Sequence, residues 1–368
     1  MAVNKVLLAK PRGFCAGVEM AIKALSFMVR IFEPPIYCYH EIVHNSYIVD
    51  RFRSLGVVFV DDISDVPSGA PVMLSAHGSA PQVVDEARAR AGIVVNAVCP
   101  LVTKVHHEMK TKAAQGYTII YIGHAGHEEA EATMAEAPDK VVLVEDERGI
   151  DQLKKTDGKV ALLTQTTLSR DDWEGVIEKA KRKFPDLWVP IRRDLCYATT
   201  NRQAAVQAIA GRSDTVVVIG SANSSNAIAL EKVARSSGCS NVVRIDSANE
   251  LPDNLSGTVG VTAGASAPEH IVEEVVKALK PRYGVEEVSV IEEDEYFPPP
   301  PELRELLKAT ANEIALATAH HLKDGYSTNN GKNGAYLDDR AISAMTALLD
   351  ADKADVLSSG RQAKRRVP

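Results

Sequence analysis

Three cysteines stand in the same local setting at wide intervals along the sequence. Cys15, Cys99 and Cys196 each follow an apolar, strand-like run and a short turn, and each precedes a stretch with helical periodicity. Each thiol therefore falls at the N-terminus of a predicted helix, where unpaired backbone N–H groups and the helix dipole favour a thiolate. A buried core position is the ordinary explanation for any one of them, but the matched settings of all three indicate a common centre.

Three thiolates can hold a metal centre that keeps one position open. In a 4Fe–4S cluster, three cysteines leave one iron free, and that iron can bind a substrate oxygen as a Lewis acid. Zinc is the alternative metal, because three cysteines with a histidine or a water also suit it. Structural zinc sites usually carry their ligands in close pairs, however, and the sequence contains no Cys-x-x-Cys. We therefore expect one 4Fe–4S cluster, with zinc as the alternative.

The other two cysteines lack this setting. Cys38 lies within a predicted strand and Cys239 near a glycine turn, so we expect both to be structural. An odd number of widely spaced cysteines does not indicate a disulfide framework. We therefore expect reduced thiols and a cytoplasmic protein.

Six predicted strands end in neutral hydrogen-bonding side chains. In parallel α/β sheets, ligands gather at the carboxyl ends of strands, where the following helices offer their N-termini. Together such side chains could surround a phosphate or diphosphate without a lysine, although each alone is commonly a helix cap or a turn residue. The candidates are His44, His77, His127, Thr166, Ser224, Ser225, Asn226 and Ser266.

One carboxylate, Glu129, follows His127 by two residues and could relay protons within this otherwise neutral site. The alternative is a solvated glutamate in a first helical turn, and the adjacent Glu128 keeps that alternative open. The sequence has neither a Gly-x-Gly-x-x-Gly after a strand nor a Walker loop. We therefore expect the electrons for any redox step to come from another protein.

The elements that must position these residues alternate between strands and helices, which predicts parallel α/β sheets. We expect three similar α/β lobes in a pseudo-threefold arrangement around a central iron–sulfur cluster. The predicted lobes are residues 15–98, 99–195 and 196–290, and a strand within residues 1–14 completes the third. Two polar strand ends follow each cysteine, which brings all the candidate residues to the same side of their sheets.

Residues 291–368 form a predicted C-terminal arm and extension, helical or flexible. An acidic, proline-rich exit leads to two predicted helices, at 302–320 and 338–349, and to a basic end. We expect a solvated appendage; a helical cover and a partner-binding segment are the alternatives.

Composition narrows the class of protein further. The 368 residues are 45% hydrophobic and 25% charged, which is typical of globular proteins, and the formal net charge of −7 argues against nucleic acid as the main partner. The apolar run near the N-terminus is too short for a signal peptide, and no stretch approaches the length that spans a membrane. We expect no nucleic-acid and no membrane partner.

Nine ordered stretches resemble the family of 4-hydroxy-3-methylbut-2-enyl diphosphate reductases (IspH/LytB), the last enzymes of the methylerythritol phosphate route to isoprenoids. The resemblance covers about residues 5–308. The stretches are PRGFCAGV (11–18), HEIVHN (40–45), SAHGS (75–79), VCPLVTK (98–104), GHAGH (123–127), TQTTLS (164–169), CYATTNRQ (196–203), SSN (224–226) and TAGASAP (262–268).

The resemblance implies three α/β lobes around a 4Fe–4S cluster held by Cys15, Cys99 and Cys196. The substrate hydroxyl would bind the open iron, and two one-electron transfers, protonation and loss of water would give isopentenyl and dimethylallyl diphosphates. The electron donor would be a reduced ferredoxin or flavodoxin. The implied diphosphate site comprises His44, His77, His127, Ser224, Ser225, Asn226 and Ser266, and the implied catalytic residues are Glu129, Thr166 and His127.

Two departures from the family pattern and two rival functions accompany this resemblance. The family often has a proline at the position of Glu128, so the proton-donor role passes to Glu129 by spacing, with Glu128 able to alter the local charge or compete for it. The family usually ends near Leu307, so the resemblance says nothing of the residues beyond. The rivals are a quinolinate-synthase-like iron–sulfur dehydratase and a non-enzymatic iron–sulfur redox sensor.

Overall fold

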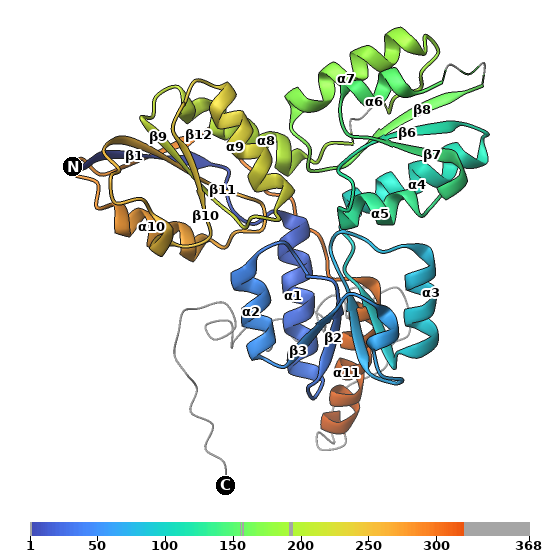
Figure 1. The fold of residues 1–368 in the computed structure, drawn as a ribbon. Coiled ribbons are helices and arrows are strands. Elements are labelled where there is room, and N and C mark those ends of the chain that lie inside the picture. Colours follow the sequence, from blue (N-terminus) through green and yellow to red (C-terminus); the bar gives the residue numbers. More distant parts are fainter. Residues whose placement is uncertain (1, 155, 157, 191–193, 320–368) are drawn as a thin grey trace.

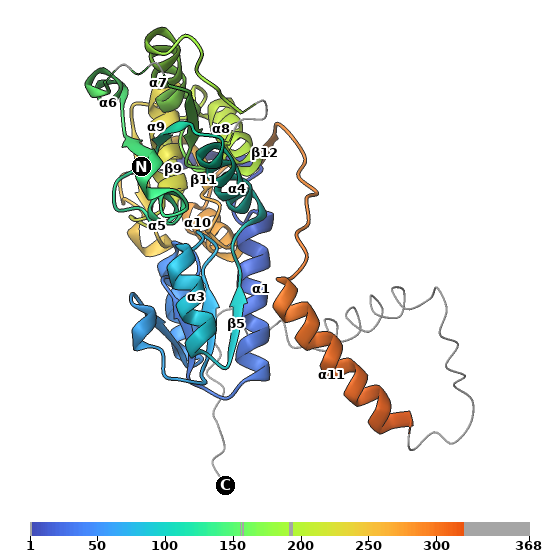
Figure 2. The same cartoon turned by 90° about the vertical axis from the view of Figure 1, so that its right-hand side faces the viewer.

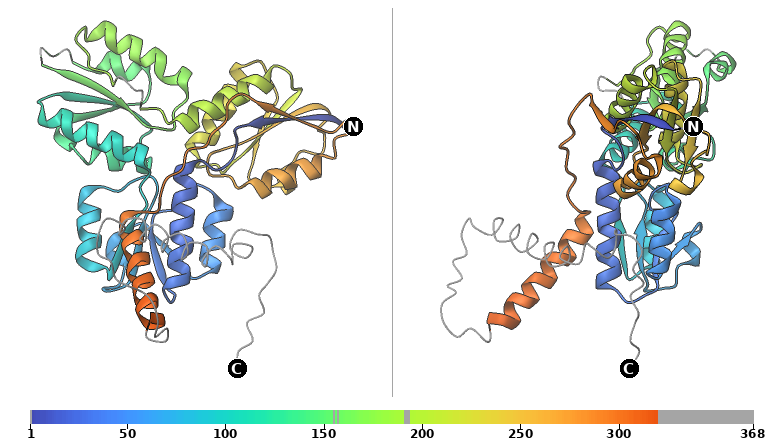
Figure 3. Two further views of the ribbon diagram at one scale, coloured as in Figure 1. Left: turned by 180° about the vertical axis from the view of Figure 1, so that it is seen from behind. Right: turned by 90° about the vertical axis from the view of Figure 1, so that its left-hand side faces the viewer.

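Three α/β lobes radiate from a common centre (Figure 1). The computed structural model describes residues 2–154, 156, 158–190 and 194–319. Every strand pair named below is parallel, as the alternation of strands and helices predicted. The view from behind shows the same three-way arrangement, with helices on the faces of each sheet (Figure 3).

The first lobe has a four-stranded sheet in the order β3-β2-β4-β5. Its core joins α1, β2 and α2, and its apolar side chains include Ile22, Ile36 and Phe52. The elements are α1 (Ala16–Ile31), β2 (Ile36–Tyr39), α2 (Ser46–Ser54), β3 (Val57–Val60), β4 (Pro71–Leu74), α3 (Pro81–Arg90) and β5 (Ile93–Asn96).

The second lobe has a three-stranded sheet in the order β7-β6-β8. All five side chains of β8 are buried, because this strand is covered on both faces, as is usual in parallel sheets. The elements are α4 (Pro100–Ala114), β6 (Thr118–Ile122), α5 (Glu128–Met134), β7 (Val141–Val144), α6 (Glu147–Gln152), β8 (Val160–Thr164) and α7 (Arg170–Lys183).

The third lobe contains strands from both ends of the chain. Its five-stranded sheet has the order β10-β9-β11-β1-β12, so the N-terminal strand lies between the last two strands. The residue boundaries given above for the lobes stay a prediction. The elements are β1 (Val3–Lys10), α8 (Tyr197–Ala210), β9 (Thr215–Ile219), α9 (Ser225–Ser236), β10 (Val242–Ile245), β11 (Gly257–Ala263), α10 (Glu269–Leu279) and β12 (Val285–Ser289).

The C-terminal arm leaves the third lobe and returns to the first. After β12 the chain runs as an extended segment to α11 (Pro301–Ala319) (Figure 2). Leu303 and Leu307 of α11 are fully buried in the core of the first lobe. The expectation of a solvated appendage is therefore wrong for the first turns of this helix, which cover apolar surface. The predicted helix at 338–349 and the basic end lie outside the described residues.

Within the described ranges, no helix combines the length and the apolar character that crossing a bilayer requires.

Candidate active site

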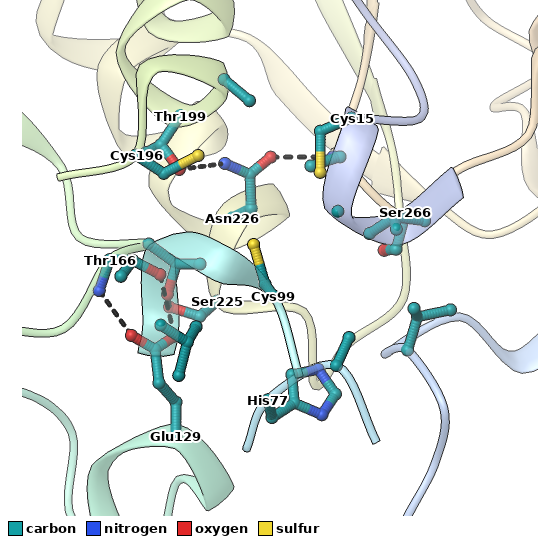
Figure 4. Close-up of a pocket in the computed structure, with 18 of the residues that line it drawn as sticks. Cys15, His77, Cys99, Glu129, Thr166, Cys196, Thr199, Ser225, Asn226 and Ser266 are labelled. Carbon is teal, nitrogen blue, oxygen red and sulfur yellow. Dashed lines mark hydrogen bonds between the residues drawn. The ribbon is translucent and has the colours of Figure 1, made fainter. Parts of the chain in front are cut away.

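The three cysteines come together because each directly precedes a helix that begins at the junction of the lobes. Cys15, Cys99 and Cys196 are the N-cap residues of α1, α4 and α8, one from each predicted unit, and none of their side chains caps its helix. All three line one cavity at the junction of the lobes (Figure 4). The thiols therefore face the common centre that their matched settings predicted.

Close helix packing brings the thiols into this cavity. A Cβ atom at Gly17 of α1 would lie 2.7 Å from the Sγ of Cys99, so only glycine permits this approach of α1 to Cys99. Burial, followed by the neighbouring Cys15, raises the pKa of Cys99 well above its usual value and that of Cys196 to about 12. Buried thiols of this kind become thiolates when a metal is present to bind them.

Glu129 is a buried carboxyl group at the start of α5, only 2% exposed. Its Oε1 accepts a hydrogen bond from the backbone N–H of Thr166 at 2.6 Å, and its Oε2 accepts one from the Thr166 hydroxyl at 3.0 Å. Burial raises the pKa of Glu129 to about 7, although both hydrogen bonds oppose that rise. A carboxyl group with this pKa can hold and release a proton near neutrality.

His127 caps α5 and has a defined tautomer. Its Nδ1 accepts the backbone N–H of Glu129 at 3.1 Å, so a neutral ring carries its proton on Nε2. That Nε2 is buried and has no hydrogen-bond partner in the described protein. Burial and the neighbouring histidines lower the pKa of His127 to about 3. A neutral His127 therefore offers an unused N–H donor.

His44 and His77 lie face to face, with ring centroids 4.0 Å apart. The Nδ1 of His44 lies 3.3 Å from a carboxylate oxygen of Glu41, on the loop after β2. The Ser266 hydroxyl donates to the backbone oxygen of His44 at 2.8 Å and so ties the third lobe to the first.

The N-terminus of α9 supplies neutral hydrogen-bonding groups. Ser224 caps the helix by accepting the N–H of Ala227, and the Asn226 side chain accepts the N–H of Ala265 at 2.9 Å. The Ser225 hydroxyl accepts a hydrogen bond from Thr167 at 3.0 Å, which ties the third lobe to the second. These bonds fix side chains beside backbone N–H groups that favour an anion.

All twelve residues predicted for the site line this one cavity, which contains about 720 Å³ of atom-free space, part of it open to solvent. Their individual roles remain predictions. Cys38 and Cys239 lie instead in the cores of the first and third lobes, as expected for structural cysteines. The twelve are Cys15, His44, His77, Cys99, His127, Glu129, Thr166, Cys196, Ser224, Ser225, Asn226 and Ser266.

Sequence reasoning missed three supporting polar residues. Gln165, fully buried, accepts the N–H of His124 and donates to Thr167. Gln165 belongs to the polar stretch after β8 that the sequence had already indicated, so this position was a signal that could have identified it as a site residue. Thr199 lines the cavity from the first turn of α8. Arg202 is 1% exposed; it lies in the stretch CYATTNRQ (196–203), but its burial was not predicted, because an arginine on a helix is usually at the surface.

Arg202 holds the loop that leads to Cys15. Its guanidinium donates to the backbone oxygens of Gly13 at 2.9 Å and Phe14 at 3.0 Å, and it pairs with Glu293 of the C-terminal arm at 3.1 Å. The third lobe, the first cysteine loop and the arm therefore meet at one side chain.

Comparison with known proteins gives one consistent result. The sequence model of the LytB protein family matches residues 6–280. Proteins named 4-hydroxy-3-methylbut-2-enyl diphosphate reductase are similar to the chain: that of Rhodopirellula baltica is 47% identical over 310 residues, covering 83% of this chain and 97% of the relative. That of Paracoccus denitrificans is 46% identical over 305 residues, covering 81% and 96%.

Solved structures agree with the sequence comparison. The chain is similar to the E-1-hydroxy-2-methyl-but-2-enyl-4-diphosphate reductase from Plasmodium falciparum, with a TM-score of 0.81, 34% identity, and coverage of 84% of this chain and 99% of that one. It is also similar to a structure described as (E)-4-hydroxy-3-methyl-but-2-enyl diphosphate reductase, the terminal enzyme of the non-mevalonate pathway. There the TM-score is 0.56, the identity 27% and the coverage 76% and 99%.

Proposed function

Because this chain belongs to the LytB family of 4-hydroxy-3-methylbut-2-enyl diphosphate reductases, we propose that its central cavity removes the hydroxyl group of (E)-4-hydroxy-3-methylbut-2-enyl diphosphate by reduction. Two electrons and two protons are consumed, the C–O bond breaks, water leaves and a C–H bond forms. The products are isopentenyl and dimethylallyl diphosphates, in the last step of the methylerythritol phosphate route. The observation that carries this proposal is the convergence of three thiols and a buried carboxyl group on one cavity.

The donor set fits a 4Fe–4S cluster held by Cys15, Cys99 and Cys196. A single tetrahedral zinc ion would bring its sulfur ligands to about 3.8 Å from one another. In the described part of the chain, three potential ligand atoms within 4.8 Å of one another occur at His44, His77 and Glu128, not at the three thiols. The three thiols are thus farther apart than a single zinc ion requires, which favours a cluster over zinc. When bound, the cluster would supply single electrons and one open iron as a Lewis acid.

Neutral donors of the cavity would bind the diphosphate. His127 directs an unpartnered Nε2–H, and α9 adds its first-turn backbone N–H groups beside Ser225 and Asn226. No lysine or arginine is among the described residues that line the cavity. The site would therefore recognise the anion through fixed hydrogen bonds, which also orient the hydroxyl end of the substrate toward the cysteines.

Glu129 would supply protons. Its pKa of about 7 leaves much of it protonated near neutrality, and the Thr166 hydroxyl lies next to it at 3.0 Å. We place Glu129 and Thr166 on the proton path to the departing hydroxyl and to the carbon skeleton. His127 holds the backbone N–H of Glu129 and so fixes the carboxyl group at the start of α5.

The electron donor would be a reduced ferredoxin or flavodoxin, because no nucleotide-binding loop was found in the sequence. The five free cysteines support a reducing compartment, and we propose the cytoplasm. Neither rival function, the quinolinate-synthase-like dehydratase or the redox sensor, gains support from the family match.

Mössbauer spectroscopy of anaerobically purified, iron-57-labelled protein tests the proposal. A 4Fe–4S signal in which one iron changes when the hydroxymethylbutenyl diphosphate is added would support it. A cluster without a unique iron would shift the function to electron transfer or sensing, and bound zinc without iron would overturn the redox chemistry. Serine in place of Cys15, Cys99 or Cys196 should lose the cluster, whereas Cys38→Ser should keep it.

A further inference from the structure

A second carboxylate, Glu128, lies directly beside the cavity but is not one of its lining residues. Its Oε2 is 2.8 Å from the Nδ1 of His77, and its Oε1 is 3.5 Å from the Nδ1 of His40. The side chain is 20% exposed. His40 reaches this position because its backbone adopts the left-handed region, with φ of 59°, just after β2. Glu128 therefore stands between two histidines, one of which lines the cavity.

The contact between Glu128 and His77 becomes an ion pair when the imidazole of His77 is protonated. The Nδ1 of His77 and the Oε2 of Glu128 are both buried at 2.8 Å from each other, and neither has another hydrogen-bond partner in the described protein. The pair is thus placed for a charge-assisted hydrogen bond.

The other groups that face His77 do not replace Glu128. His44 stacks on its ring, and His127 lies edge-on with centroids 6.2 Å apart. Glu41 acts on His77 from beyond His44, with its carboxylate 3.3 Å from the Nδ1 of His44. Glu128 is the carboxylate in direct contact with His77.

His77 differs from His127 in what it can offer an anion. His127 keeps its proton on Nε2 and donates while neutral. A neutral His77 whose Nδ1–H faces Glu128 has a lone pair on Nε2, which repels a phosphate oxygen. His77 can donate from Nε2 only when both nitrogens carry protons.

We propose that Glu128 is a positioning residue that holds His77 as a cation in the diphosphate complex, so that Nδ1–H pairs with Glu128 and Nε2–H donates to the anion. This inference rests on the proposed function of the same cavity. Binding of the diphosphate then places one further proton on His77, supplied by the solvent or by the partly protonated anion.

The electrostatics of the free protein fit this arrangement. Burial and the nearby His44 lower the pKa of His77, whereas Glu128 opposes that change. Burial would raise the pKa of Glu128, but His77, His44 and His40 outweigh it and lower the pKa to about 2. Glu128 is therefore ionised at every pH of interest, while His77 gains its second proton when an anion arrives.

Whether Glu128→Gln weakens or tightens diphosphate binding shows whether Glu128 acts through His77 or only as a nearby negative charge. A carboxylate that only adds negative charge near the site repels a diphosphate, so its neutralisation by Glu128→Gln would tighten diphosphate binding. If Glu128 acts through His77, the same change weakens binding. We expect Glu128→Gln to bind inorganic pyrophosphate about tenfold more weakly at pH 8, the effect of one pKa unit on His77, and the difference to narrow toward pH 6.

Isothermal titration calorimetry of the anaerobic, cofactor-loaded protein with inorganic pyrophosphate tests this. Titrations in two buffers of different ionisation enthalpy give the number of protons taken up. Because pyrophosphate can change its own protonation on binding, the difference between the two proteins is the measure, and we expect the wild type to take up about one proton more than Glu128→Gln does. Glu131→Gln, a change to an exposed carboxylate on the same helix, is the matched control and should behave as wild type.

A double-mutant cycle distinguishes an effect of Glu128 through His77 from a general loss of structure. In a His77→Asn background, Glu128→Gln should cause no further loss of pyrophosphate affinity. If Glu128→Gln binds pyrophosphate as tightly as the wild type or more tightly, or takes up as many protons, the proposed role of Glu128 is overturned while the diphosphate site stands. Loss of wild-type binding on adding EDTA would also overturn it, because His44, His77 and Glu128 would then hold a cation. A wild type that binds no pyrophosphate overturns the diphosphate site itself.

Discussion

At the start of α5, two adjacent glutamates have opposite electrostatic surroundings. Burial raises the pKa of Glu129 to about 7, whereas the histidines around Glu128 lower its pKa to about 2. Successive residues of a helix are rotated by about 100°, so one side chain enters the cavity while the other meets His77 and His40. The sequence left open which of the two could donate a proton, because adjacency alone cannot show which side chain is buried.

Replacement of Glu129 by glutamine should reduce turnover about 10²- to 10⁴-fold, the usual contribution of a general acid. The amide keeps the size and the contact with Thr166 but has no proton to give. Reductant-driven turnover of the hydroxymethylbutenyl diphosphate measures the loss, with iron content showing that the cofactor is retained. Turnover near the wild-type rate would remove Glu129 from the proton path.

The pH dependence follows from the direction of the same shift. Glu129 has its pKa raised from 4.5 to about 7, so the proton-donating form is present below about pH 7 and is lost above it. We expect kcat of the wild type to fall as the pH rises through this value. A profile that rises across this range would show that the ionised form acts instead.

At the scale of elements, the site depends on how helices begin. The cysteines and polar residues that the sequence singled out line one cavity, because most strand ends and helix starts follow from apolar periodicity and turn residues; β2, however, ends at Tyr39, five residues before His44. It could not show that α11 packs on the first lobe, because an amphipathic helix does not specify the surface that buries it. Nor could it reveal Gly17, whose role depends on a neighbour in another helix.

Gly17→Ala should lower the iron and sulfide content of the purified protein. The added methyl group would lie 2.7 Å from the Sγ of Cys99, so the thiol or the helix must move. Gly211→Ala is the matched control, because its nearest neighbour would be 3.5 Å away and its backbone is helical. Equal cofactor content in both variants would mean that α1 and Cys99 can separate without loss.

Leu307→Ala should lower the free energy of unfolding by about 2–5 kcal/mol, the usual cost of a large-to-small change in a core. Leu307 is fully buried against the first lobe, whereas Glu305 on the same helix has a side chain that is 76% exposed. Thermal unfolding of Leu307→Ala and Glu305→Ala therefore compares a buried with a solvated position. A similarly small change in both would show that α11 is dispensable for the first lobe.

At the scale of the whole molecule, hydrogen bonds between lobes hold the cavity together. Ser266 links the third lobe to the first, and Ser225 links it to the second. Arg202 adds the loop before Cys15 and the C-terminal arm. Such contacts join residues far apart in sequence, which is why sequence periodicity could not predict them.

Arg202→Lys should speed the loss of iron to a chelator several-fold. Lysine keeps the charge but cannot reproduce the planar set of donors that holds Gly13, Phe14 and Glu293. Arg212→Lys, at a half-exposed surface pair, is the control. The rate of iron release from the two variants gives the comparison, and equal rates would show that the buried arginine does not secure the cysteine loop.

The position of β1 between β11 and β12 sets the order in which the protein can be completed during synthesis. The ribosome delivers β1 first, but its two partners emerge only after most of the chain, at residues 257–263 and 285–289. At synthesis rates of about 5–20 residues per second, many seconds pass before the first strand can pair with either partner. Because Cys15 follows β1 directly, the three-thiol pocket is finished last, after the first two lobes have had time to form.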